Sequence, residues 1–309
     1  MPVINVMSER LAALPPISLA ELQAEAAFLT RRDRKYLVPV EAVGAVLADI
    51  DPDIRTLEID GRRSFRYLTP YFDDSAYSAY RHAAYRRPNR FKVRTRLYAD
   101  SGICQLEVKV RDARGRTVKH RRGHDAASLE CLAEAERAWL SAFPQVAPFA
   151  DRLRHCLTTR YERITLVLPG GTGRVTIDCD LVFALPCGNS YSLPRHLVIE
   201  TKSAGGPTEV DRILWRHGFR PVSMSKFSLG LSLLVPDLPA NRWHRLRVQL
   251  AAAVGNECRE TSAIPVRDGT HRVVTSAPSA PRGQSSAMHA SAAGAVGGRR
   301  SAPSPGPAA

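Results

Sequence analysis

The chain has 309 residues, long enough for one large or two average domains, and its formal charge of +14 indicates a partner with phosphate groups, nucleic acid or an acidic membrane surface. Six cysteines without CxxC pairs or metal-ligand spacing argue against a disulfide scaffold and favour reduced thiols. Because we find no secretory signal and no apolar run of about 20 residues, we expect a cytoplasmic protein without a transmembrane segment.

The N-terminal half is predicted to contain two helices and then a series of strands. Ser18–Glu21 fits a capping box at the start of a helix that continues to about residue 29. A short strand at residues 34–38 is followed by Pro39, which suits the first turn of a second helix that ends near residue 50. Residues 63–121 are mainly of period two and predict antiparallel strands joined by short turns.

The C-terminal half is predicted to alternate strands with helices and to end in a tail. Its predicted helices are 126–143, 207–217 and 227–235, and its predicted strands are 159–168, 174–183 and 197–202. Residues 170–173 predict a hairpin turn between two of these strands. We expect an N-terminal extension at 1–17, one domain at 18–250, and a disordered tail rich in Ala, Ser, Pro and Gly at 251–309.

Several predicted strands carry a charge at every second residue. Residues 91–97 place Lys92, Arg94 and Arg96 on one face, and residues 106–111 do the same with Glu107, Lys109 and Arg111. Glu200 and Lys202 repeat the pattern in residues 198–202. Each strand therefore has one apolar face and one ionic face.

Two arrangements of the ionic faces remain open at this point. They either face water, as in an ordinary half-buried sheet, or line a channel whose outside is covered by the predicted helices. Charges that line a channel must be paired, hydrated or neutralised by a ligand. Asp178 and Asp180 share a predicted face with Arg174 and either orient the bases or contact a metal through water.

An ordered series of motifs resembles the vacuolar transporter chaperone (VTC) domain, the polyphosphate polymerase branch of the CYTH-like triphosphate tunnel metalloenzymes. The similarity covers about residues 25–245. Its motifs are Asp33–Val38, Arg66-Tyr67 with Tyr71–Asp73, Phe91–Arg96, Leu106–Lys109, Thr117–Arg121, Thr176–Asp178, Ile199–Ser203 and Ser225–Phe227. The resemblance implies an α+β fold: an antiparallel β-barrel tunnel with a charged interior and flanking helices.

The resemblance also implies roles for individual residues. The residues that it assigns to catalysis are Lys35, Arg94, Arg96, Lys109 and Lys226. Those that it assigns to binding phosphate are Lys119, Tyr161, Arg163, Arg174, Lys202 and Ser225. Glu200 matches the glutamate that holds a divalent metal, Mn²⁺ or Mg²⁺.

The function implied by the resemblance is transfer of the γ-phosphoryl group of ATP to a growing polyphosphate chain. A tunnel triphosphatase and a non-catalytic polyphosphate-binding module remain as alternatives. The wider superfamily opens with an ExExK strand, whereas this chain has Arg31, Asp33 and Lys35, which weakens the cyclase and thiamine-triphosphatase readings. We expect ATP and inorganic polyphosphate as partners and no specific nucleic acid, because base-stacking aromatics are not interleaved with the basic residues. The sequence identifies no membrane-protein partner.

Overall fold

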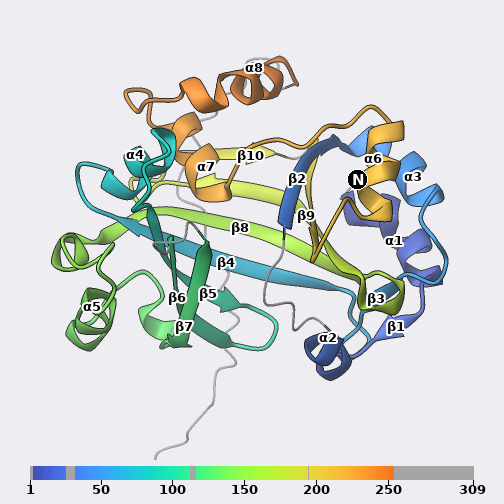
Figure 1. Ribbon diagram of the computed structural model, residues 1–309, viewed down its shortest axis with the longest axis horizontal. Coiled ribbons are helices and arrows are strands. Elements are labelled where there is room, and N and C mark those ends of the chain that lie inside the picture. Colours follow the sequence, from blue (N-terminus) through green and yellow to red (C-terminus); the bar gives the residue numbers. More distant parts are fainter. Residues whose placement is uncertain (1–2, 26–31, 112–115, 194, 254–309) are drawn as a thin grey trace, which may run out of the picture. The chain divides into compact units, whose positions relative to one another are not determined.

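The predicted strands form one large sheet (Figure 1). The computed structural model describes residues 3–25, 32–111, 116–193 and 195–253. Within these residues the strands are β1 (Pro16–Ile17), β2 (Arg32–Pro39), β3 (Arg55–Leu57), β4 (Ser64–Asp73), β5 (Phe91–Tyr98), β6 (Ile103–Arg111), β7 (Thr117–Gly123), β8 (Arg154–Val167), β9 (Gly173–Ala184), β10 (Ser190–Leu193) and β11 (His196–Ser203). The helices are α1 (Val3–Ala13), α2 (Leu19–Glu25), α3 (Val40–Ala48), α4 (Ser78–Ala84), α5 (Glu134–Ser141), α6 (Glu209–Arg216), α7 (Lys226–Leu234) and α8 (His244–Ala253).

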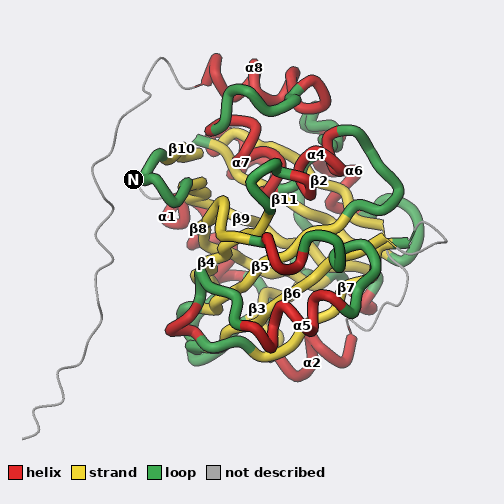
Figure 2. Tube along the Cα trace, turned by 90° about the vertical axis from the view of Figure 1, so that its left-hand side faces the viewer, coloured by secondary structure: helices red, strands yellow, loops and turns green. Residues whose placement is uncertain are grey.

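The sheet follows the order β2-β11-β9-β8-β4-β5-β6-β7. All of these neighbours pair antiparallel, and β1 with β3 forms a short parallel pair at one edge. β2 and β7 stand at the two ends of this order, so backbone pairing does not close the described part of the sheet into a complete barrel. Figure 2 shows α2 and α5 on one side of the strands and α8 on the opposite side. The α+β class with an antiparallel tunnel-like sheet and flanking helices is confirmed.

One buried carboxylate on α6 forms hydrogen bonds with side chains on the outer face of β2 and β11. Asp211 on α6 is fully buried and accepts hydrogen bonds from Tyr36 Oη at 2.6 Å and from Thr201 Oγ1 at 2.6 Å. It also accepts from the backbone N–H of Thr208 at 2.6 Å and lies 3.3 Å from Arg34 Nη1. Its lone pairs are therefore filled mainly by neutral donors, which offsets the cost of burying a charge.

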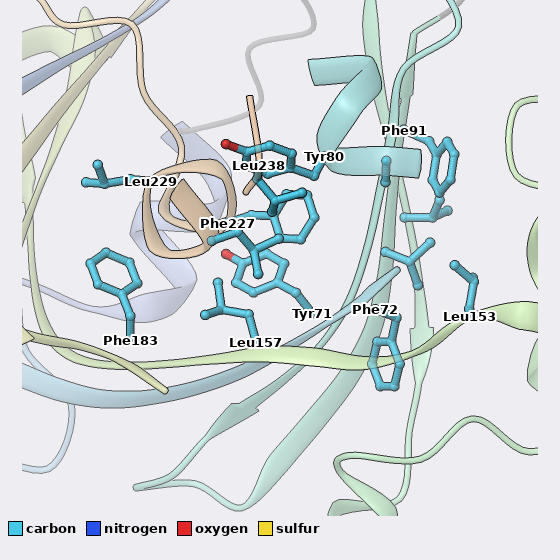
Figure 3. Packing of buried hydrophobic residues seen from close by; sticks show 14 of the residues in the cluster. Tyr71, Phe72, Tyr80, Phe91, Leu153, Leu157, Phe183, Phe227, Leu229 and Leu238 are labelled. Atoms are coloured by element: carbon cyan, nitrogen blue, oxygen red, sulfur yellow. The ribbon is translucent and has the colours of Figure 1, made fainter. Parts of the chain in front are cut away.

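Helix α7 packs against the opposite face of the sheet. Phe227 lies among Tyr71, Leu157 and Phe183 in the apolar cluster that Figure 3 shows. The approach is close at Gly230, where a Cβ atom would lie 2.5 Å from Phe183 Cδ1. Glycine is therefore required at this position, since any larger residue would push the helix away from the sheet.

Most predicted elements are confirmed, with two corrections. The capping box is present, because Glu21 N–H donates to Ser18 Oγ at 3.2 Å and Ser18 N–H to Glu21 Oε2 at 2.9 Å. The predicted helix 126–143 is wrong in its first half: a short 3₁₀ turn at Ala126–Ser128 precedes α5, which begins only at Glu134. Helix α4 lies where strands were expected. It is held by buried Asp73, which accepts from the backbone N–H groups of residues 74, 79 and 80.

The first helix belongs to the folded domain rather than to a separate extension. Met7 and Leu11 of α1 are buried in the apolar cluster beneath α3, so described residues before 18 contribute to the core. The predicted tail beyond residue 253 lies outside the described residues.

No helix of the described chain is both long and apolar enough to span a membrane. Cys104 and Cys179 are buried and free, whereas Cys131 and Cys187 are exposed.

Candidate functional site

One face of the curved sheet gathers charged residues from seven strands, β2, β5, β6, β7, β8, β9 and β11. Val198, Glu200 and Lys202 of β11 lie on this face, because the alternate residues Leu197 and Ile199 are buried on the other side. The face is concave, because residues of strands that are not neighbours in the sheet come close across it. Strand β2 does not pair with β5, yet the charge of Lys35 on β2, together with burial, lowers the pKa of Lys92 on β5. We call this surface the ionic face.

A first cluster on the ionic face is built around Glu107 of β6. Its carboxylate accepts from Arg94 Nε at 2.7 Å, contacts Lys119 Nζ and lies 3.9 Å from Arg96 Nη1. Burial raises the pKa of Glu107, but these three cations lower it by more than burial raises it. The net pKa lies below the ordinary value, so the carboxyl is ionised. Arg94 also donates to Tyr71 Oη at 3.3 Å. The predicted cations Arg94, Arg96 and Lys119 therefore lie together.

A second cluster is built around Asp178 of β9. Arg163 binds it with two hydrogen bonds, Nε to Oδ1 at 2.6 Å and Nη2 to Oδ2 at 2.8 Å, and Lys226 of α7 donates to the same carboxylate. Burial raises the pKa of Asp178, but Arg163 and Lys226 lower it to about 2. Lys226 Nζ lies 4.3 Å above the ring of Tyr161, which stacks on Tyr67. Here Asp178 orients the bases, one of the two roles predicted for it.

The third cluster is built around Glu200 of β11. Its Oε1 lies 3.1 Å from Lys35 Nζ and contacts Lys202 Nζ. Burial raises the pKa of Glu200, but Lys202 and Lys35 bring it well below the usual range. Lys202 pairs in register with Asp33 on one side and with Arg174 on the other. Both predicted phosphate-binding residues, Lys202 and Arg174, therefore share this face with Glu200.

Two lysines on the ionic face form no salt bridge within 4 Å among the described residues, although the charge of Glu200 acts on both and that of Asp33 on Lys109. Lys92 and Lys109 stand directly opposite each other on β5 and β6, and Lys109 stands opposite Lys119 on β7. Burial and the charges of Lys109 and Arg94 lower the pKa of Lys92, and burial and Arg94 lower that of Lys109 to about 8. Placing two ammonium groups side by side is unfavourable unless an anion joins them.

Lys92 was not among the residues assigned by resemblance. Its place on the face of Arg94 and Arg96 was already visible from the period-two pattern, and that pattern was the signal for it. The sequence alone did not show which residue lies opposite Lys92. Only the register between β5 and β6 shows that this residue is Lys109.

Two other predicted residues need separate comment. Ser225 caps α7, because its Oγ accepts from Ser228 N–H at 3.1 Å and donates to Ser228 Oγ at 3.0 Å. The shared face predicted for Asp178 and Asp180 is wrong. A β-bulge between β8 and β9 inserts Asp180 with φ of +51°, and it lines a cavity of about 450 Å³ with Glu162 and Arg66. The extra residue shifts the alternation by one position.

The donor set fits a divalent metal only if phosphate oxygens complete its coordination. No group of three His, Cys, Asp or Glu side chains capable of holding a metal occurs in the described part of the chain. Mg²⁺ is commonly bound through one or two carboxylates together with substrate phosphates and water. Glu200 supplies one such carboxylate, and its Oε1 is shared by two lysines.

The ionic face has the chemistry of a polyanion site. Arginine forks bind two oxygens of a phosphate, and lysines add compact charges. Three carboxylates hold most of these cations in place, while Lys92 and Lys109 leave positive charge unbalanced. A chain of phosphate groups is complementary to such a row.

A protein-family model described as the VTC domain matches residues 30–235 of the 309. A solved structure from Vibrio parahaemolyticus, described as a proposed adenylate cyclase, is 12% identical and covers 66% of this chain and 98% of its own, with a TM-score of 0.39. A proposed adenylyl cyclase from Hippeastrum, described as having a dominant triphosphatase activity, is 16% identical and covers 68% and 98%, with a TM-score of 0.42. No curated protein matches the chain.

Proposed function

The chain belongs to the VTC-domain family, and from that premise we propose that it is a polyphosphate polymerase. The reaction transfers the γ-phosphoryl group of ATP to the end of an inorganic polyphosphate chain and releases ADP. The observation that carries the proposal is the row of Lys92, Lys109 and Lys119 across three neighbouring strands. Its first two members form no salt bridge within 4 Å among the described residues, and burial and neighbouring cations lower the pKa of both, which favours a ligand with negative charges in series.

The roles of the residues follow from phosphoryl transfer, in which positioning and charge neutralisation supply most of the catalysis. Arg94 and Arg163 are held by their carboxylates with the guanidinium groups buried and pre-oriented. They and the lysines bind the oxygens of the transferred group and of the acceptor. Because these donors are already in place, little reorganisation is needed when charge develops in the transition state.

Transfer is favoured over hydrolysis by the state of the acids. Glu107, Asp178 and Glu200 all have pKa values lowered by paired cations despite burial, so they are weak bases. A water nucleophile needs a base to take its proton. The terminal oxygen of a polyphosphate chain is already anionic and needs none.

A divalent metal, Mn²⁺ or Mg²⁺, is part of the proposal. Glu200 would hold it, and when bound it would neutralise charge on the phosphate oxygens and favour the leaving group. Lys35 and Lys202 keep Glu200 ionised, as a metal ligand must be.

Incubation of the purified full-length chain with ATP and Mn²⁺ tests the proposal. We expect ADP to accumulate together with long phosphate chains, which ³¹P NMR separates from orthophosphate by the signal of internal phosphates. Orthophosphate without chains would instead establish a tunnel triphosphatase. Binding of polyphosphate without any turnover would establish a non-catalytic binding module.

A further inference from the structure

A buried hydroxyl on the ionic face has no hydrogen-bond partner. Thr176 of β9 lies between Arg174 and Asp178 in the alternation of the strand, so its side chain points to the same face as theirs. The residue is 4% exposed, and its Oγ1 forms no hydrogen bond within the described part of the chain. A buried hydroxyl without a partner costs free energy, because it has given up its hydrogen bonds to water.

Thr176 stands directly opposite Glu200, the residue proposed to hold the metal. The register between β9 and β11 pairs these two residues, and the register between β8 and β9 places Thr165 on the other side of Thr176. Opposed side chains on one face of an antiparallel pair have their Cβ atoms about 5 Å apart. The threonine hydroxyl and the glutamate carboxylate are therefore neighbours, yet no hydrogen bond joins them. Both lysines that contact Glu200 do so at its Oε1.

Threonines on the outer face of the sheet show what a purely structural hydroxyl does. Thr201 donates to Asp211 Oδ1 at 2.6 Å, and Thr95 donates to the carbonyl of Leu129 at 2.5 Å. Valine has nearly the shape of threonine and a high strand propensity, so packing alone would favour valine at position 176. An unpartnered hydroxyl beside a carboxylate is better explained by a ligand that both groups bind.

Two other unpartnered hydroxyls on the ionic face provide a comparison. Thr69 and Thr159 stand opposite each other on β4 and β8, and both are fully buried without a hydrogen bond of Oγ1 among the described residues. Thr159 also faces Phe183 of β9, which lies in the apolar cluster that contains Phe227. The strand registers pair neither of these threonines with an acidic residue. Thr176 differs from them in having Glu200 opposite.

A hydroxyl oxygen suits the metal that the ionic face is proposed to bind. Mg²⁺ and Mn²⁺ prefer oxygen ligands, and threonine hydroxyls bind Mg²⁺ beside phosphates in nucleotide-binding loops. At metal–oxygen distances of about 2.1 Å, two adjacent ligand oxygens lie about 3 Å apart. Rotation of two opposed side chains brings their oxygens within this separation. A neutral second oxygen also adds coordination without adding charge to the site.

We propose that Thr176 is a second protein ligand of the divalent metal. Its hydroxyl oxygen binds the ion beside the carboxylate of Glu200, and phosphate oxygens complete the coordination. The inference rests on the proposed function, because it assumes a metal that Glu200 holds together with phosphate. Its specific content is that the Thr176 hydroxyl contributes to ligand binding only when the metal is present.

Calorimetric titrations of the full-length protein with tripolyphosphate, once with EDTA and once with excess Mn²⁺, test the inference. For Thr176→Val we expect the dissociation constant to be unchanged in EDTA and to rise about tenfold with Mn²⁺. Thr176→Ser keeps the hydroxyl and should behave as the wild type in both titrations. Thr159→Val is the matched control, because it removes a buried unpartnered hydroxyl from the same face, and it should change neither constant.

Thermal unfolding without ligand separates this effect from damage to the fold. Both valine variants lose only an unpartnered buried hydroxyl, so their melting temperatures should equal or exceed that of the wild type. Equal affinity of Thr176→Val and the wild type with Mn²⁺ would overturn the inference and leave the polymerase assay unaffected. A loss of the same size in EDTA would also overturn it, since the hydroxyl would then contact phosphate. A wild type whose affinity does not respond to Mn²⁺ would overturn the metal assignment of the proposed function together with the inference.

Discussion

The two faces of β2 and β11 carry buried charges in opposite ways. On the outer face, Asp211 is surrounded by donors from Tyr36, Thr201 and Thr208, so its hydrogen-bonding capacity is filled. On the ionic face, the carboxylates are outnumbered by cations, and Lys92 and Lys109 form no salt bridge within 4 Å among the described residues, so neighbouring cations and burial lower the pKa of both. In a polar network that only stabilises the fold, donors and acceptors of the protein satisfy one another. A network that binds a charged ligand retains charge that the protein itself does not balance.

The largest effect is expected when the filled network is broken. Asp211→Asn replaces an acceptor by an amide whose N–H groups face other donors, and leaves Arg34 without its partner. We expect the free energy of unfolding to fall by about 3 kcal/mol or more, because one partner of a buried ion pair is removed. Chemical denaturation measures this loss. Activity per folded molecule should be retained.

Asp180→Asn is the matched control for that substitution. Asp180 has a positive φ, which asparagine adopts readily, and it lies at the bulge outside the Asp211 network. Its free energy of unfolding should change by less than about 0.5 kcal/mol. Equal losses for the two variants would remove the distinction between the filled network and other buried or half-buried acids.

The next effect concerns Glu200 on the ionic face. Glu200→Gln removes the proposed metal ligand, and we expect turnover of ATP to fall about 100-fold. Affinity for tripolyphosphate should be retained or increased, since a negative charge is lost from the site. Glu209→Gln, at the exposed start of α6, serves as control. Unchanged turnover in Glu200→Gln would refute the metal assignment.

The pH dependence should separate binding from stability. Lys109, Lys119 and Lys202 have pKa values lowered by burial to about 8 from the ordinary 10.5, so they lose charge as the pH rises through 8. Affinity for tripolyphosphate should therefore fall more than tenfold between pH 7 and 9, a loss of about 1.4 kcal/mol or more. Titrations at constant ionic strength measure it.

The stability of the free protein should move in the opposite direction. In the unfolded chain the same lysines keep their protons up to about 10.5, so between pH 8 and 10.5 the unfolded state binds more protons than the folded one. Their contribution to the free energy of unfolding consequently rises over this range. If affinity and this contribution to stability changed with pH in the same direction, the lowered pKa values of these lysines and their role in binding phosphate would be contradicted.

The smallest effect tests Ser225, which lies next to Lys226 at the start of α7. Ser225→Ala removes a helix cap, and we expect the free energy of unfolding to fall by about 1 kcal/mol. If Ser225 only caps the helix, affinity for tripolyphosphate should change little. A loss of affinity larger than the loss of stability would show direct contact with phosphate, as the family resemblance implies.

The sequence predicted the ionic face well because alternation in a strand depends only on neighbouring residues. Lys92, Arg94 and Arg96 lie together as expected, and so do Glu200 and Lys202. The pattern failed at Asp180, since a bulge adds one residue and period two has no means of showing it.

Other features were not visible in the period-two pattern. Helix α4 begins at Ser78 after Tyr77 in a left-handed conformation, and its first N–H groups are satisfied by Asp74 and Asp73. The opposition of Lys92 and Lys109 requires the register between β5 and β6. Hence residue types could be assigned to a face from the sequence, but the balance of charge on that face could not.

The central claim is that the unbalanced lysines of the ionic face bind phosphate chains. Calorimetric titration of the double variant Lys92→Gln/Lys109→Gln with tripolyphosphate at pH 7 tests it most directly. We expect binding at least about 100-fold weaker than in the wild type, a loss of about 2.7 kcal/mol. The melting temperature of the free protein should be equal or higher, because like charges have been removed. Wild-type affinity in the double variant would contradict the account.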